Sequence, residues 1–157
     1  DKGRWGKASQ DKTSNPRFQG IAVHHSFKSY VALLAEVSVH NNKVKVHKIT
    51  CAVHCGQAIN PDIVKAQMSG GIAFGLTQAM KGKISIKDGA VQETNFHDYE
   101  LLRMNEMPEV EVHIISSSDA PTGVGEPAVP VVAPAIANAI FAATGKRLRS
   151  LPLTLDS

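Results

Sequence analysis

A carboxylate framed by glycine and proline is the part of this sequence best suited to chemistry. In the run Thr122-Gly123-Val124-Gly125-Glu126-Pro127, two glycines bracket Val124, so the backbone can approach a ligand without a Cβ in between. Glu126 follows directly, and a carboxylate that loses part of its hydration beside apolar residues suits a general base. The plainer alternative, which composition alone favours, is a surface loop whose glutamate stabilises the positive end of the following helix.

A second candidate is a helix with glycines in its interior. The segment Ala66-Gln67-Met68-Ser69-Gly70-Gly71 precedes Gly75, and each glycine inside a helix costs roughly 1 kcal/mol relative to alanine. The usual reason is close approach of a ligand or of another backbone. Gln67 can donate and accept hydrogen bonds, so a rigid cofactor lying against Gly70 and Gly71 is one explanation. Tight packing of the helix on a sheet is the other.

Histidines and cysteines near the middle of the chain raise the question of a metal site. The residues concerned are His47, Cys51, His54 and Cys55. In an extended strand His54 points away from the other three, and structural zinc sites normally use shorter paired spacings such as C-x₂-C. We therefore expect no metal ligands here and expect both cysteines to be buried small residues. Residues 95–99 mix polar and aromatic types and predict a loop packed on the sheet, with a pocket wall as the alternative.

The composition limits the classes of protein to which the chain can belong. Of its 157 residues, 43% are hydrophobic and 20% are charged, which excludes a disordered or collagen-like chain. Two cysteines are too few for a disulfide framework. The 17 lysines and arginines give a net charge of +3 but are scattered, which argues against nucleic acid as a partner. No run approaches the roughly 18 apolar residues of a membrane span.

Alternating apolar residues predict the strands that position these groups. The run His40-Asn41-Asn42-Lys43 supplies a tight turn, because asparagine tolerates positive φ, and so predicts a hairpin. Lys87-Asp88-Gly89 predicts a second hairpin in the same way. The predicted strands cover residues 20–27, 31–39, 44–53, 83–86, 90–94 and 109–115.

Two helices are expected to pack on the sheet. Asn60 is a suitable N-cap for a helix that begins at Pro61 and continues at helical spacing to about Met80. Apolar residues over 134–144 predict a second helix, which ends at Gly145. The expected fold class is α+β, in which two hairpins and one further strand form a mixed sheet that carries both helices.

The beginning of the chain differs in character from the rest. Residues 1–18 are polar without an apolar period, so we assign them to a flexible N-terminal segment and assign 19–157 to one domain. The first residue is Asp1 rather than methionine, so a processed or truncated chain is expected. Any targeting signal would then lie upstream, and the cytoplasm and the periplasm both stay open as compartments.

Seven motifs follow one another in a fixed order between Gly20 and Leu153. They are CAVHCG at 51–56, INP at 59–61, QMSGGIAFGL at 67–76, NFHDY at 95–99, LRMNEMP at 102–108, GVGEP at 123–127 and AIANAI at 135–140. Together they resemble the C-terminal part of the large, molybdopterin-binding subunit of the xanthine oxidase and aldehyde oxidoreductase family. Within that family they are most similar to the isoquinoline 1-oxidoreductase β-subunit branch.

The resemblance implies an enzyme that hydroxylates a carbon next to a ring nitrogen, or an aldehyde carbon, with a water-derived oxygen at molybdenum. The glutamate of the family's GEP motif is the general base for this oxygen, and the matching residue is Glu126. The glutamine ahead of the glycine helix hydrogen-bonds the pterin cofactor, which matches Gln67. Because the cofactor's dithiolene holds the metal, the resemblance implies no protein ligand. Further cofactor-binding residues implied are Gly70, Gly71, Val124 and Gly125.

The resemblance also implies partners. Such subunits are several times longer, so we expect this chain to be part of a larger molybdopterin-binding domain whose upstream remainder binds most of the cofactor, in its cytosine dinucleotide form. A separate small subunit carries [2Fe–2S] clusters, and the substrate is an aromatic heterocycle such as isoquinoline. Alone, the chain is expected to be inactive. The alternatives are an aldehyde dehydrogenase of the same molybdenum family and a non-catalytic α+β binding or assembly module, which would tolerate replacement of Glu126.

Overall fold

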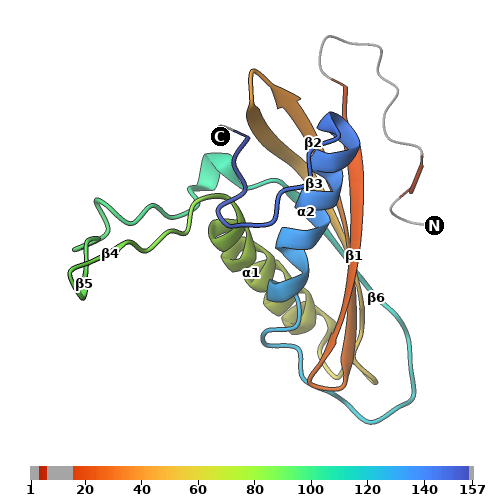
Figure 1. Ribbon diagram of the computed structural model, residues 1–157. Coiled ribbons are helices and arrows are strands. Elements are labelled where there is room, and N and C mark those ends of the chain that lie inside the picture. The colour runs from red at the N-terminus through yellow and green to blue at the C-terminus, as the bar shows by residue number, and fades with distance from the viewer. Residues whose placement is uncertain (1–3, 7–15, 156–157) are drawn as a thin grey trace.

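A twisted sheet is the framework of the molecule. The computed structural model describes residues 4–6 and 16–155, so most of the predicted N-terminal segment lies outside the described residues. Within the described part, one sheet has the strand order β1-β2-β3-β6 (Figure 1). The strands are β1 (Phe18–Ser26), β2 (Ser29–His40), β3 (Lys43–His54) and β6 (Glu109–Ile114).

The sheet is mixed, as predicted. β1 pairs with β2 and β2 with β3 in antiparallel register, whereas β3 and β6 run parallel. The hairpin between β2 and β3 turns at Asn41 and Asn42, whose φ angles of 48° and 60° confirm the turn expected from the two asparagines. A parallel pair needs a long crossover connection, and the chain from β3 to β6 supplies it.

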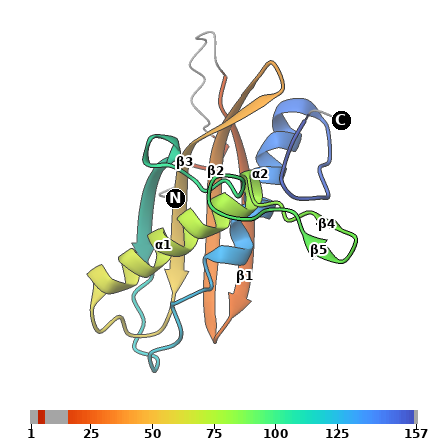
Figure 2. The ribbon, with the colours of Figure 1, turned by 90° about the vertical axis from the view of Figure 1, so that its left-hand side faces the viewer.

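Both helices lie on the same side of the sheet (Figures 1 and 2). The first, α1 (Pro61–Met80), begins and ends where the sequence predicts. The Asn60 side chain is its N-cap, since Oδ1 accepts hydrogen bonds from the backbone N–H groups of Asp62 and Ile63 at 3.1 and 3.2 Å.

The second helix, α2 (Val129–Thr144), begins five residues earlier than predicted. Its first turn contains Pro130, where a missing N–H costs no helical hydrogen bond. Pro134, which the sequence suggested as the first helical residue, lies inside the helix and is exposed, and there it removes a single backbone hydrogen bond. The predicted end is confirmed, because Gly145 has φ 73° and donates its N–H to Phe141 at 2.8 Å.

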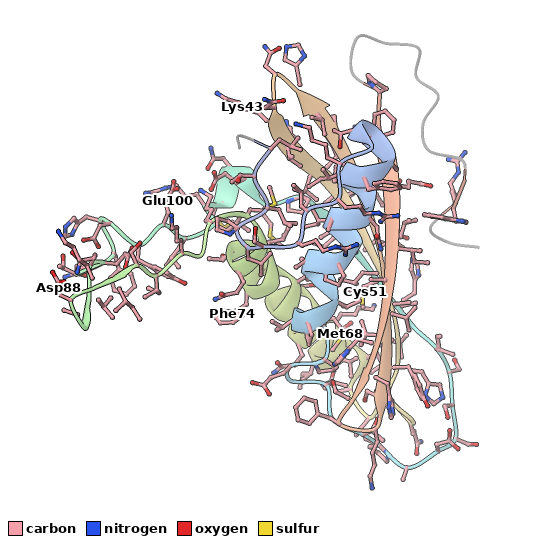
Figure 3. The ribbon with its side chains drawn as sticks, in the orientation of Figure 1. Lys43, Cys51, Met68, Phe74, Asp88 and Glu100 are labelled. Carbon is pink, nitrogen blue, oxygen red and sulfur yellow. The ribbon has the colours of Figure 1, made fainter. Side chains whose placement is uncertain are left out.

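The second predicted hairpin forms but does not join the main sheet. Strands β4 (Ile86–Lys87) and β5 (Ala90–Val91) make a separate two-stranded sheet on an arm that projects from the body, with Asp88 near its tip (Figure 3). The prediction of one sheet containing both hairpins is therefore wrong. The apolar side chains of these short strands are exposed, so they offer no face to the core.

Phe96 is also 78% exposed, so residues 95–99 do not pack on the sheet as expected. A 3₁₀ turn, η1 (Met104–Glu106), precedes β6.

The hydrophobic core fills the space between the sheet and the two helices. Cys51 of β3 and Met68 of α1 are fully buried there (Figure 3). Burial raises the pKa of the Cys51 thiol to about 12 and also raises that of Cys55. Both cysteines are buried, as the sequence predicts, and both are free. The other large, fully buried side chains include Leu33, Ile49, Ile72, Leu76, Ile136 and Ile140.

Candidate functional site

Residues singled out in the sequence come together around a cavity of about 630 Å³. Its walls are the C-terminal end of β1, the middle of α1, and the loop and first turn that begin α2. Val124 is not among the lining residues, because it is half-buried and packs against the hydrophobic core. The other five predicted site residues line the cavity: Gln67, Gly70, Gly71, Gly125 and Glu126.

The Glu126 side chain lies where the cavity is open to solvent. The side chain is exposed, and among the described residues its carboxylate has no hydrogen-bond or ion-pair partner. The sequence predicts that the Glu126 carboxylate loses part of its hydration. Within this chain it stays hydrated, because Glu126 and the neighbouring Gly125 are both exposed. The Glu126 carbonyl oxygen accepts the Val129 N–H at 2.9 Å, which places the residue just ahead of α2. A negative charge is favoured there by the helix dipole.

Backbone hydrogen bonds fasten the loop that carries Glu126 to the sheet. The Thr122 N–H donates to the carbonyl oxygen of Cys55 at 3.0 Å, and the Gly123 N–H donates to that of Phe27 at 3.1 Å. The loop is thus attached beyond the end of β3 and at the turn after β1 before it enters α2. Its path past the cavity is set by the sheet.

The glycines of α1 have two different roles. A Cβ on Gly71 would lie 3.2 Å from the Ala128 Cβ, and one on Gly75 would lie 2.9 Å from the Val129 carbonyl oxygen. These two glycines let α1 and α2 pack closely. A Cβ on Gly70 would meet nothing within 4 Å, and Gly70 lines the cavity. The packing explanation therefore holds for Gly71 and Gly75, with α2 rather than the sheet as the packing partner, whereas the cofactor explanation stays a prediction for Gly70.

Six further lining residues were not predicted from the sequence. His24 and Ser26 lie on the same face of β1 as Gly20, because side chains alternate along a strand. This face is directed at the helices, so the alternation along β1 could have pointed to these two residues. The Ser26 Oγ is buried and has no hydrogen-bond partner among the described residues. Leaving a buried hydroxyl unpaired costs about 1–3 kcal/mol, so Ser26 is a polar group that the contacts of the described residues leave unsatisfied. The remaining four are Phe27, Phe74, Val129 and Pro130.

Apolar side chains give the cavity a surface suited to a flat ligand. Phe27 is 58% exposed and Phe74 is 60% exposed, and the Phe74 side chain points away from the sheet (Figure 3). Aromatic side chains of this kind bury large areas against planar groups. The N-terminus of α2, with Val129 and Pro130, also borders the cavity and presents the positive end of the helix dipole. The arrangement suits a planar, partly anionic molecule.

The histidines and cysteines considered for a metal site have other contacts. The His47 Nε2 lies 2.7 Å from the Ser38 Oγ, and burial lowers the pKa of His47. His54 faces Asp119 at 3.6 Å. Over the residues that the structure describes, no group of three or more His, Cys, Asp or Glu side chains could hold a metal ion. No helix in those residues is both long and apolar enough to span a membrane.

Comparison with known sequences connects the chain to cofactor-binding proteins. The family model described as "Molybdopterin cofactor-binding domain" matches residues 2–108. Isoquinoline 1-oxidoreductase subunit beta of Brevundimonas diminuta is 40% identical over 136 residues, which are 85% of this chain and 17% of that protein. A membrane-bound aldehyde dehydrogenase (pyrroloquinoline-quinone) of Gluconacetobacter polyoxogenes is 33% identical over 159 residues, covering 98% of this chain and 20% of that protein. The chain thus spans a fifth or less of these relatives.

Comparison with solved structures agrees on the fold. The crystal structure of quinoline 2-oxidoreductase from Pseudomonas putida 86 superposes with a TM-score of 0.74. The match covers 79% of this chain and 17% of that chain, at 22% identity. At this identity the likeness shows the fold alone, so it supports the arrangement of sheet and helices and says nothing about the ligand.

Proposed function

Because the chain belongs to the molybdopterin cofactor-binding domain family, we propose that it forms one wall of the cofactor and substrate site of a molybdenum hydroxylase, within a longer large subunit. The observation that carries the proposal is the cavity itself. It gathers Gln67 and Gly70 from α1 with Gly125 and Glu126 from a loop more than fifty residues further along the chain. Residues this far apart in sequence, and of the types that the resemblance implies, share one site.

The cavity residues fit a pterin cofactor. The Gln67 amide can both donate and accept hydrogen bonds to the heteroatoms of a pterin ring. Gly70 and Gly125 leave space that a Cβ would fill. The positive end of α2 would stabilise phosphate groups, in agreement with the cytosine dinucleotide form of the cofactor that the resemblance implies. The upstream part of the subunit would supply the other walls and cover Glu126.

Glu126 would act as the general base. When bound, the molybdenum cofactor supplies the two-electron acceptor for replacing a substrate C–H bond by a C–O bond, with the oxygen taken from water. The ionised Glu126 carboxylate accepts the proton that the water-derived oxygen loses as its bond to carbon forms. In the complete enzyme the second proton would go to solvent, and the two electrons would pass to the [2Fe–2S] clusters of the small partner subunit that the resemblance implies.

The substrate class we propose is an N-heteroaromatic compound of the isoquinoline type. The relative with 40% identity is named for isoquinoline, and Phe27 and Phe74 offer apolar surface for a planar ring system. An aldehyde is the second candidate, because the relative with 33% identity is named an aldehyde dehydrogenase.

The test is to purify the complete large subunit that contains these residues, together with its small subunit. Bound molybdenum is measured, and isoquinoline and an aromatic aldehyde are assayed in ¹⁸O-labelled water. We expect molybdenum near one atom per large subunit and label in the product of the ring substrate. Label in the carboxylate formed from the aldehyde alone would establish the second candidate. A protein without molybdenum, or a molybdenum-loaded protein that labels neither product, would overturn the proposal in favour of a binding or assembly module.

Replacing Gly70 with alanine is expected to stabilise the protein and weaken cofactor binding. The helical conformation of α1 gains up to about 1 kcal/mol from the change, and the added Cβ has no neighbour within 4 Å. The same Cβ intrudes on the cavity. We expect a higher unfolding temperature of the cofactor-free subunit and less molybdenum retained after dialysis. Ser69→Ala is the control, since Ser69 is on α1 but does not line the cavity; equal molybdenum loss in both variants would contradict the prediction.

A further inference from the structure

We propose that the turn between β1 and β2 positions the loop that carries Glu126 (residues 122–126), and that the Ser29 hydroxyl is the group through which the turn holds this loop. This inference rests on the proposed role of Glu126 as general base. Ser29 is the first residue of β2 and is fully buried. It is a positioning residue, because its contacts are to the loop three to four residues ahead of Glu126.

The Ser29 hydroxyl joins two groups of the loop. Its Oγ donates to the carbonyl oxygen of Gly123 at 2.7 Å and lies 2.7 Å from the Thr122 Oγ1. A serine hydroxyl has one proton, and the Gly123 carbonyl can only accept. The Thr122 hydroxyl is therefore the donor to Ser29. Both hydrogen-bonding directions of Ser29 are used to hold Thr122 and Gly123.

The backbone of the turn holds the same two residues from another side. The Phe27 carbonyl oxygen accepts the Gly123 N–H at 3.1 Å, and a Cβ on Gly123 would lie 2.7 Å from the Phe27 Cβ. Gly123 thus fits against the turn only as glycine. With the bond from Thr122 to Cys55, four hydrogen bonds converge on a two-residue segment.

The turn adopts a conformation that its residues do not favour. Phe27 and Lys28 have φ angles of 52° and 63°, the left-handed region that turns of this type normally fill with asparagine and glycine. Strained backbone of this kind persists where surrounding contacts hold it. Here the strained geometry directs the Phe27 carbonyl at Gly123 and places the Phe27 side chain on the cavity wall.

Glu126 depends on this support because its own carboxylate has no hydrogen-bond partner among the described residues. Its position is set by the backbone between the Thr122–Gly123 attachment and the buried Pro127 and Ala128. A displacement of about 1 Å at a reacting group can reduce a rate by up to about 100-fold. Loosening the attachment should thus lower kcat more than it changes KM.

The test uses the complete enzyme with three variants at Ser29 and Thr122 and one control variant at Ser38, all compared with Glu126→Gln. Ser29→Ala removes the hydroxyl, and Ser38→Ala makes the same change at the other end of β2, where the buried Ser38 Oγ contacts His47 at 2.7 Å. Thr122→Val removes the second hydroxyl at nearly constant shape, and Thr122→Ser keeps it. Measured are kcat, KM, the pH profile of kcat, bound molybdenum and unfolding temperature.

We expect Ser29→Ala and Thr122→Val to lower kcat about tenfold and to change the shape of the pH profile of kcat. KM and the amount of bound molybdenum should change little. Ser38→Ala and Thr122→Ser should stay within about twofold of the original enzyme. A kcat of Ser29→Ala equal to that of Ser38→Ala, while Glu126→Gln is inactive, overturns this inference alone. Full activity of Glu126→Gln overturns the base assignment and the inference with it. Where Ser29→Ala fails to fold, the Thr122 pair decides: equal kcat in its two members overturns the inference.

Discussion

Replacement of Glu126 by glutamine is expected to lower kcat by about two to four orders of magnitude, the range that a general base supplies. Glutamine keeps the shape of the side chain but cannot accept a proton at neutral pH. Because the Glu126 carboxylate holds no other described residue in place, the loop and the cavity should keep their structure. The measurement is kcat on the better of the two substrates, with bound molybdenum determined on the same samples.

The control for that variant is Glu100→Gln. Glu100 is an exposed carboxylate near the base of the projecting arm (Figure 3), 3.3 Å from the Lys81 Nζ and outside the cavity. The same chemical change there should leave kcat within about twofold, because exposed ion pairs contribute little. Retained activity in Glu126→Gln would contradict the role of Glu126 as a base. Loss of molybdenum together with activity would show that Glu126 is needed for cofactor retention and would leave its role as a base open.

A single methyl group at Gly20 is expected to destabilise the protein by about 3 kcal/mol or more. Gly20 of β1 faces α2 so closely that a Cβ would overlap the Ala135 carbonyl oxygen and the Ala139 backbone nitrogen, and would lie 2.8 Å from the Ala139 Cα. Overpacking against side chains costs about 1–3 kcal/mol. Backbone atoms within a helix cannot rotate away, so the cost for Gly20→Ala should reach or exceed the upper end.

The unfolding temperature of the complete subunit measures this effect, and denaturant midpoints provide an independent value. Gly70→Ala is the matched control, because the same substitution there meets no atom within 4 Å. Equal unfolding temperatures for Gly20→Ala and Gly70→Ala would mean that α2 lies further from β1 than the structure shows. A fall in Gly20→Ala alone would establish the close packing that places the N-terminus of α2 at the cavity.

Elements with local signals were predictable from the sequence. The Asn60 cap, the two-asparagine turn after β2 and the glycine end of α2 each depend on residues within one turn of the chain. The start of α2 was not predictable in this way, because a proline is equally compatible with a first turn and with an exposed position inside a helix. The separate sheet of β4 and β5 also escaped prediction, since a turn signal specifies a hairpin and not its neighbour.

The residues of the candidate site can be divided in the same way, into those with a local sequence signal and those without one. Gln67, Gly70 and Glu126 belong to short motifs for which a ligand is one of the explanations that the sequence offers, and the fold brings them to one cavity. Ser26 carries no such signal, because its distinguishing property is a missing hydrogen-bond partner, which exists only in the folded chain. Ser29 is similar, since its partners Thr122 and Gly123 lie more than ninety residues away in the sequence.

The connectivity of the sheet has a consequence for the order in which the molecule assembles. The first three strands are joined by tight turns and pair with close neighbours in sequence, whereas α2 reaches β1 over a separation of 117 residues, as in the hydrogen bond from the Asn138 amide to the Ile21 carbonyl oxygen. Contacts between residues near in sequence form at the lower entropic cost. We therefore expect the three-stranded meander to form early and the Glu126 loop to become ordered only as α2 docks. The proposed cofactor would then bind only after the hydrophobic core between the sheet and the helices has formed.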